Sequence, residues 1–430
     1  MPAVPASSAS PGRRDESVSP QLSSRSPAAV IWISGLGAQG IEEGLEEIAK
    51  RVAFACDRRD IAPPTFAVRT AIKPEQAGRN VHVPRCTVLR TDSSGTRPVL
   101  DFYGLGTAHT LIGDRAGRSL PSQLAFAVRA VARVMPKAIK TRKRGVGKTR
   151  RERTQLLYAR LAMIAMIVGL VALLGGLAGT LAVGDLPPWA RFLQAPILFF
   201  GGLGIWKSSF ARKLGSAALV GYSVVDYLDR GGDKGSQLRG QLADLLERLA
   251  ELEDPPESID IVAYSFGSIV AIDALFPYVQ KPPLRLETVD RLITIACPFD
   301  FVRSFWPDYF TRRFSRAGVP GKWVNVYAPS DVLASNFIDG KDGIGEAVNA
   351  VEVRDGLPRP SPPHNVAYLM EGREEPVSTG QALLLRGLRF HGQYWSSRIA
   401  SEESVFDQVV GYLGKDATPR PTGTRAAMRE

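Results

Sequence analysis

The pattern of apolar and polar positions predicts two α/β regions separated by a long apolar region. Short runs rich in β-branched residues alternate with stretches in which apolar positions recur at helical spacing. Before the apolar region, we expect strands at 28–34, 65–70, 86–90 and 98–103 and a helix at 41–52. After it, we expect strands at 258–263, 291–296 and 323–327 and helices at 218–228, 237–252, 267–275 and 402–413. Strands that alternate with helices favour a largely parallel sheet.

The apolar region is long enough to cross a membrane. Residues 161–184 are 24 positions without a charge. At about 1.5 Å per residue they would span about 36 Å, more than the roughly 30 Å of bilayer hydrocarbon. A second apolar run at 190–206 is shorter and is bordered by Trp189 and Trp206. These two runs predict a transmembrane helical hairpin.

Composition and charge limit the classes of function. An apolar content of 44% and a charged content of 23% are those of an ordinary globular chain. The net charge is +11, but residues 137–153 contain nine basic residues and one acidic residue and so contribute +8 of it. Because the excess lies beside the predicted span, we expect contact with anionic membrane lipids and no nucleic-acid partner. Basic residues outside both runs place the two ends of the hairpin in the cytoplasm.

Neither the two ends of the sequence nor the cysteines indicate a further functional site. Residues 1–27 are rich in Ser, Pro, Ala and Arg and have no apolar core, which predicts a disordered leader rather than a secretory signal. Residues 415–430 are predicted to be a disordered tail. The three cysteines, Cys56, Cys86 and Cys297, are odd in number and widely spaced, so neither a disulfide framework nor a zinc site is indicated.

The most informative segment is 259–275, where an apolar strand runs through Tyr264, Ser265 and Phe266 directly into an apolar helix. A sharp strand-to-helix turn of this kind lifts a serine oxygen clear of the sheet and needs small residues two positions either side. Ala263 and Gly267 are those small residues, so the pattern is G-x-S-x-G with Ala in the first position. The alternative interpretation of Ser265 is the N-cap of an ordinary helix.

A nucleophilic serine needs a histidine base. In folds that present the serine on a strand-to-helix turn of this kind, the chain order is serine, then acid, then histidine. Of the four histidines, only His364 and His391 follow Ser265. His364 stands in a Pro-rich stretch that is typical of a surface loop, whereas His391 precedes the last predicted helix. We therefore favour His391 as the base.

The acid should follow a strand, because active sites in open α/β sheets gather at the carboxyl ends of strands. Asp331 follows the predicted strand 323–327 through a Pro-Ser turn and is the favoured acid. Asp300, which follows the preceding strand, is the alternative.

The loop after the first strand has two interpretations. In a hydrolase, Leu36 or Gly37 would supply one backbone N–H to the oxyanion and Phe266 the other. The same loop, GLGAQG at 35–40, also satisfies G-x-G-x-x-G, and Asp57 follows about 20 residues later, so a dinucleotide site is an alternative. The GVGKT at 145–149 lacks the first glycine of a phosphate loop and any preceding strand, and we discard it.

At this level of detail the sequence resembles a known family. The segments ISGLGAQG, VAYSFGS, LITIACPFD, WVNVYAPSDVLAS and FHGQYW resemble, in order and spacing, lipase- or esterase-like serine hydrolases of the α/β-hydrolase fold. The resemblance covers roughly 28–110 and 216–414. It implies an α/β-hydrolase-type, mostly parallel sheet with helices on both faces. Two positions depart from the family, because Ser34 and Tyr264 stand where a histidine is usual.

The resemblance also implies roles for the candidate residues. Ser265 would be the nucleophile, Asp331 the acid and His391 the base, and Leu36 or Gly37 with Phe266 would form the oxyanion hole. Residues 28–122 and 216–414 would be two parts of one hydrolase domain, and 123–215 a basic stretch and membrane hairpin inserted between them.

Because the two parts must meet, both would lie on the cytoplasmic side, and the second apolar run would return the chain either by spanning the membrane or as a re-entrant loop. We therefore expect an integral membrane serine hydrolase that cleaves an ester and needs no cofactor. Its location points to a lipid or another apolar ester as the substrate. A nucleotide-binding oxidoreductase and a non-catalytic membrane scaffold with a hydrolase fold are the alternatives.

Overall fold

The computed structural model describes residues 26–36, 41–59, 65–71, 84–113, 120–143, 153–157, 160–161, 164, 167, 209–229, 233–278, 286–316, 318–338, 346–368, 390–394 and 404–413. The predicted tail, nearly all of the predicted leader and most of the two predicted spans lie outside these residues. Within the part of the chain that the structure describes, no helix has both the length and the apolar character needed to cross a bilayer. The hairpin at 161–184 and 190–206 therefore stays a prediction.

The fold is built on one eight-stranded, mostly parallel sheet with the order β2-β3-β4-β1-β5-β6-β7-β8. The strands are β1 (Ala28–Ile33), β2 (Thr65–Ala71), β3 (Arg85–Asp92), β4 (Gly95–Leu105), β5 (Ile259–Tyr264), β6 (Val289–Ile295), β7 (Lys322–Tyr327) and β8 (His364–Ala367). β1 pairs in parallel with both β4 and β5, and the parallel ladder continues through β8. Only the pairs β2–β3 and β3–β4 are antiparallel. The mixed α/β architecture and the largely parallel sheet predicted from the sequence are confirmed.

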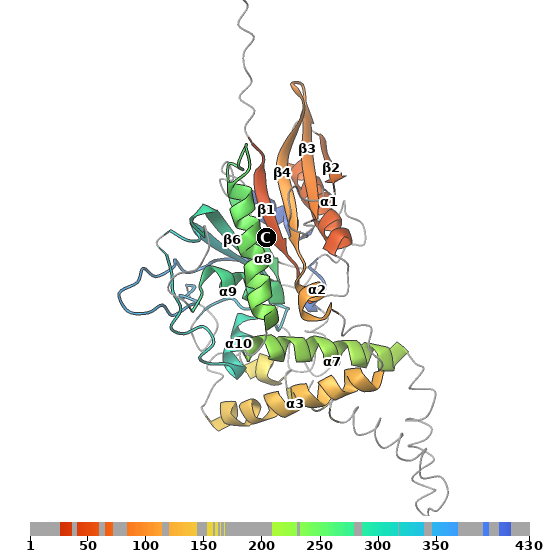
Figure 1. Cartoon of the computed structure of the whole chain (residues 1–430), viewed down its shortest axis with the longest axis vertical. Helices are drawn as coiled ribbons and strands as arrows, with labels where there is room; N and C mark the ends of the chain where they lie inside the picture. The colour runs from red at the N-terminus through yellow and green to blue at the C-terminus, as the bar shows by residue number, and fades with distance from the viewer. Residues whose placement is uncertain are drawn as a thin grey trace, which may run out of the picture.

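Helices cover both faces of the sheet, with α8 and α9 on one face and α1 on the other (Figure 1). The short α13 packs in the same cluster as α1. Ile31 and Ile33 of β1 pack in the cluster that contains the leucines of α8, whereas Val30 and Trp32 pack in the cluster that contains Leu45 of α1. Successive side chains of a strand point to opposite faces, so burial on both faces explains the continuous apolar run in β1. These helices are α1 (Ile41–Arg59), α8 (Asp233–Ala250), α9 (Phe266–Leu275) and α13 (Phe406–Val409).

Two further helices, α3 (Leu120–Lys143) and α7 (Ser209–Leu228), pack on each other at one end of the molecule (Figure 1). On α7, the Ser223 hydroxyl donates to the carbonyl oxygen of Leu111, and Asp229 just after α7 accepts a hydrogen bond from the Trp306 indole. Leu111 ends α2 (Thr107–Leu111), which follows β4, and Trp306 follows α10 (Phe299–Phe305). Because α2 and α10 come after the carboxyl ends of their strands, the α3–α7 pair lies at the carboxyl edge of the parallel strands.

Several elements differ from the sequence prediction in length or were not predicted. β8, η2 (Leu286–Thr288) and α10 were not predicted, and His364 lies on the edge strand β8 rather than in a loop. The last predicted helix, 402–413, is described from 404 and contains only α13 and a 3-10 turn, η3 (Val410–Tyr412). These elements are three to seven residues long, too short for a hydrophobic period to identify them.

Candidate active site

Ser265 occupies a sharp turn between β5 and α9. Its backbone has φ 52° and ψ −125°, in a region that non-glycine residues rarely adopt and that costs about 1–3 kcal/mol. The Ser265 N–H donates to the carbonyl oxygen of Ile295 on β6 at 2.8 Å, which ties the turn to the sheet. Its side chain makes no capping hydrogen bond to α9, so the geometry does not favour the N-cap interpretation.

The turn depends on glycine at position 267, as the sequence pattern requires. A Cβ atom added to Gly267 would lie against the carbonyl oxygen of Ile33 and 2.6 Å from that of Ser34. A Cβ atom added to Gly35 would lie 3.1 Å from Cβ of Ser265. The start of α9 and the loop after β1 therefore approach each other so closely that only glycine fits at 267.

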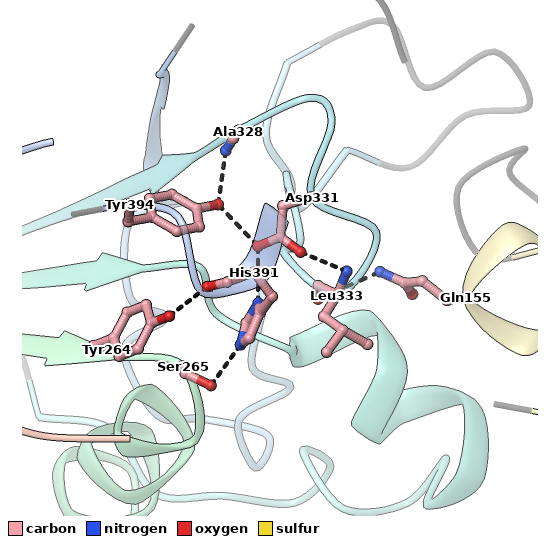
Figure 2. Close-up of polar contacts among 8 residues, drawn as sticks. All are labelled: Gln155, Tyr264, Ser265, Ala328, Asp331, Leu333, His391 and Tyr394. Atoms are coloured by element: carbon pink, nitrogen blue, oxygen red, sulfur yellow. Dashed lines mark hydrogen bonds and ion pairs between the residues drawn. The ribbon is translucent and has the colours of Figure 1, made fainter. Parts of the chain in front are cut away.

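Three predicted residues form one chain of hydrogen bonds at the carboxyl edge of the sheet (Figure 2). Ser265 Oγ lies 2.7 Å from His391 Nε2, and His391 Nδ1 lies 2.8 Å from Asp331 Oδ2. Asp331 lies in the loop after β7, and His391 in the short described segment 390–394. The structure therefore brings together residues that are 126 and 60 positions apart in the sequence.

The buried carboxylate of Asp331 is held at both oxygens. Oδ1 accepts the N–H of Leu333 at 2.9 Å, and Oδ2 accepts the hydroxyl of Tyr394 at 3.0 Å in addition to His391 (Figure 2). The Tyr394 hydroxyl accepts the N–H of Ala328 at 2.8 Å. Since buried polar atoms need hydrogen-bond partners, these contacts satisfy both oxygens of the carboxylate and orient it toward His391.

Tyr264 holds the imidazole from the other side. Its hydroxyl donates to the backbone carbonyl oxygen of His391, and the two rings stack with centroids 5.8 Å apart and planes at 20°. Burial, and then the nearby charge of Asp331, raise the pKa of Tyr264 above its usual value, so its hydroxyl remains a donor. Tyr264 was predicted only to flank the site, in a position where a histidine is usual, and Tyr394 was not predicted as a site residue, although it follows His391 by three positions in the sequence.

The alternative acid and base lie elsewhere. Asp300 is on α10, where its carboxylate is 3.6 Å from Arg303 and its N–H donates to the Ser335 hydroxyl at 2.7 Å. His364 is an exposed residue of β8 whose ring centroid is 6.2 Å from that of Tyr412. The geometry therefore favours Asp331 and His391 over both.

The predicted oxyanion donors are described in part. Phe266 is the first residue of α9 and follows Ser265 directly. Leu36 is partly buried in the loop after β1, next to the Gly35 that approaches Ser265. Gly37 lies outside the described residues, so its role as a donor stays a prediction.

The dinucleotide alternative finds little support in the topology. A dinucleotide unit places the strand after the first helix beside the first strand, with an acidic residue near the end of that strand. Here β2, which follows α1, is separated from β1 by β3 and β4. Asp57 lies within α1, where it accepts the N–H of Phe66 at 2.9 Å. The remaining glycines of the loop, 37 and 40, lie outside the described residues.

A segment next to the predicted span reaches the loop that carries the acid. Gln155 is fully buried in the helical residues 153–157, and its Nε2 lies 3.5 Å from the carbonyl oxygen of Leu333 (Figure 2). The Leu333 N–H in turn contacts Asp331. No pattern in the sequence indicated this contact, since it joins residues 178 positions apart.

Comparisons with protein-family models, with curated proteins and with solved structures find no match to this chain. Among the residues that the structure describes, no cluster of His, Cys, Asp or Glu could hold a metal ion. The chemistry of the site must therefore be inferred from the contacts around Ser265.

Proposed function

We propose that this chain is a serine hydrolase of the α/β-hydrolase type that cleaves an ester through an acyl-enzyme. One observation carries the proposal: the hydrogen-bonded chain from Ser265 through His391 to the buried Asp331, with distances of 2.7 and 2.8 Å. The strained backbone of Ser265 supports it, because a cost of this kind is usually retained where a side chain must be presented for chemistry.

Each side chain has a defined role in the proposed reaction. His391 Nε2 accepts the proton of Ser265 as Oγ attacks the ester carbonyl, and Asp331 stabilises the resulting imidazolium. The N–H of Phe266 and an N–H of Leu36 or Gly37 bind the oxyanion. His391 then donates its proton to the leaving alcohol, and the acyl group remains on Ser265. Water then loses a proton to His391 and attacks the acyl-enzyme, and His391 returns that proton to Ser265 Oγ as the bond to the acyl group breaks and the acid is released.

The same proposal includes a membrane location, with the hydrolase domain on the cytoplasmic side and spans at about 161–184 and 190–206. The apolar runs and the adjoining basic run support it. A lipid or another apolar ester is then the proposed substrate. If the protein hydrolysed short soluble esters but did not hydrolyse membrane lipids, that result would argue against a lipid substrate.

Labelling with a fluorophosphonate probe tests the reaction, because such probes react with the activated serine of a serine hydrolase. We expect the wild type to be labelled and Ser265→Ala and His391→Ala not to be labelled. His364→Ala is the matched control, since it removes an exposed histidine from β8 and should label like the wild type.

Circular dichroism of each purified variant shows whether it is folded. Folded wild type that takes up no probe would refute the proposal, and the non-catalytic scaffold would then be the better interpretation. Labelling that persists in Ser265→Ala would place the reactive serine elsewhere.

A further inference from the structure

Helix α3 has two apolar faces, and among the residues that the structure describes only one of them is packed. One face contacts α7 through a small cluster: Phe126, Ala130, Leu219, Tyr222 and Val225. Arg133 and Lys137 also turn toward α7, where they pair with Asp226 and Asp229. Both contacts leave the opposite side of α3 open.

The open side of α3 is formed by exposed residues that are almost all apolar. Val128 and Met135 are 44% and 45% exposed, which places them among the few large apolar side chains that the described residues expose. This outward face consists of the apolar residues Ala125, Val128, Ala132, Met135 and Pro136, with the exposed Arg129 beside them. Their spacing follows the helical repeat, so they form one stripe rather than scattered exposures.

The charge around this outward face has one sign. α3 contains six basic residues and no acidic residue. The basic run at 137–153 overlaps its last turns and adds only one acid, Glu152. An exposed apolar stripe on a helix whose charged residues are all basic is the combination that binds at the surface of an anionic membrane.

Both ends of the basic run are fixed at the edge of the sheet that carries the candidate site. At its start, Lys137 contacts Asp229 and lies 4.3 Å from the ring centroid of Trp306. Just after its end, Gln155 contacts the loop of Asp331. Figure 1 shows α3 lying across this end of the molecule, beyond α7.

We propose that the outward face of α3 lies in the interface of a bilayer that contains anionic lipids, and that it turns the carboxyl edge of the sheet, with Ser265, toward that bilayer. The docking rests on the exposed stripe and its charge and is independent of the proposed hydrolase activity. Only its consequence, delivery of a lipid ester to Ser265, rests on that activity. The position of α3 would then favour substrates that leave the bilayer over substrates from solution.

The depth of a fluorophore in the full-length, reconstituted protein tests the docking. We would label Val128→Cys with an environment-sensitive dye in a Cys56→Ser background, since Cys86 and Cys297 are buried. Leu252→Cys is the matched control, because Leu252 is 48% exposed but lies beyond the end of α8, near the amino-terminal edge of the sheet. The vesicles contain phosphatidylcholine with or without phosphatidylglycerol and carry a brominated lipid as the quencher.

We expect the dye at position 128 to be quenched several-fold more than the dye at 252 in anionic vesicles. High salt, removal of phosphatidylglycerol or Arg129→Glu should each reduce that difference, because each weakens the electrostatic attraction. Equal quenching at the two positions would overturn the proposal. So would energy transfer between labelled copies without lipid quenching, which would assign this face to a second copy of the chain.

Fluorophosphonate labelling of the same samples separates the two proposals. Quenching at position 128 without labelling of Ser265 would retain the docking and refute the hydrolase. Labelling without quenching would retain the hydrolase and refute the docking.

Discussion

Two buried carboxylates, on either side of the central strand β1, are held in different ways. Asp101 on β4 is paired with Arg85 at 2.6 Å and accepts the hydroxyl of Thr87 at 2.6 Å. Asp331 accepts hydrogen bonds from a backbone N–H, a tyrosine hydroxyl and an imidazole. A carboxylate paired with a permanent cation holds strands together, whereas one paired with a titratable ring can respond to a proton transfer.

Backbone strain also distinguishes the β2–β3 end of the sheet from the part of the described chain that carries the candidate site. All four non-glycine residues with positive φ, Ser265, Ala296, Arg312 and Phe337, come after β5 in the chain. The β2–β3 end has none among its described residues, and β2 is exposed at alternate positions. Strain persists where surrounding packing overdetermines a conformation, so the strands buried on both faces can hold an unfavourable turn that an edge hairpin cannot.

The largest expected effect separates the two acids. Asp331→Asn should lower kcat/KM for a short chromogenic ester about 10⁴-fold, as loss of the acid does in other triads, and leave the fold intact. Asp101→Asn should instead lower the free energy of unfolding by about 1–3 kcal/mol and leave the activity within a few fold, because it weakens a structural ion pair. Urea unfolding and ester hydrolysis of both variants check this. Similar losses of activity in both variants would show that Asp101 and Asp331 do not differ in role as described.

The second effect contrasts two glycines in helices. Gly267→Ala forces a Cβ atom against the end of β1 and should cost about 3 kcal/mol or more of unfolding free energy. Gly44→Ala, in α1, meets no atom within 4 Å and should stabilise the protein by about 0.5–1 kcal/mol. Denaturation midpoints of the two variants should therefore move in opposite directions. A tolerated alanine at 267 would show that α9 and β1 can separate.

The sequence predicted the parts of the site that depend on local pattern. The strand, turn and helix around Ser265 follow from an apolar run, small neighbours and a short apolar helix. The order of serine, acid and histidine narrowed the candidates for the acid and the base, and the local sequence around each candidate then favoured Asp331 over Asp300 and His391 over His364. The roles of Tyr264, Tyr394 and Gln155 could not be predicted, because each depends on which distant segment folds against it. Short elements such as β8 and α10 carry too few residues to show a period.

The third effect is a loss of stability at alkaline pH. Burial raises the pKa of Tyr103 on β4 from 10.0 to about 12, and the pKa of Tyr264 at the site is raised in the same direction. Above pH about 10 the unfolded chain has lost these protons while the folded chain still holds them, so stability falls as pH rises. Because a tenfold change in proton affinity corresponds to about 1.4 kcal/mol, Tyr103 should contribute up to about 2–3 kcal/mol to this loss.

Denaturant unfolding at increasing pH measures this loss. Tyr103→Phe should flatten the alkaline decline by removing the contribution from the β4 end, and Tyr264→Phe by removing the one from the site. An unchanged slope in both variants would mean that neither tyrosine stays protonated in the folded protein.

The smallest effect concerns the tyrosine that contacts Asp331. Tyr394→Phe should lower kcat/KM about tenfold, the size expected for one hydrogen bond to a charged group. Tyr222→Phe, which changes a buried tyrosine in the α3–α7 contact, is the control and should leave kcat/KM unchanged. Equal losses of kcat/KM in the two variants would show that the contact with Asp331 is not the cause.

The pairing of β1 also has a consequence for how the protein is made. One neighbour of this central strand, β4, is synthesised soon after it, but the other, β5, comes only after the apolar region has left the ribosome. During that interval one edge of β1 has no native strand to pair with. Free strand edges invite pairing with other chains, and late long-range pairing slows folding. Successful production of the protein will therefore depend on conditions that keep nascent chains apart until β5 emerges, such as low expression rates or abundant chaperones.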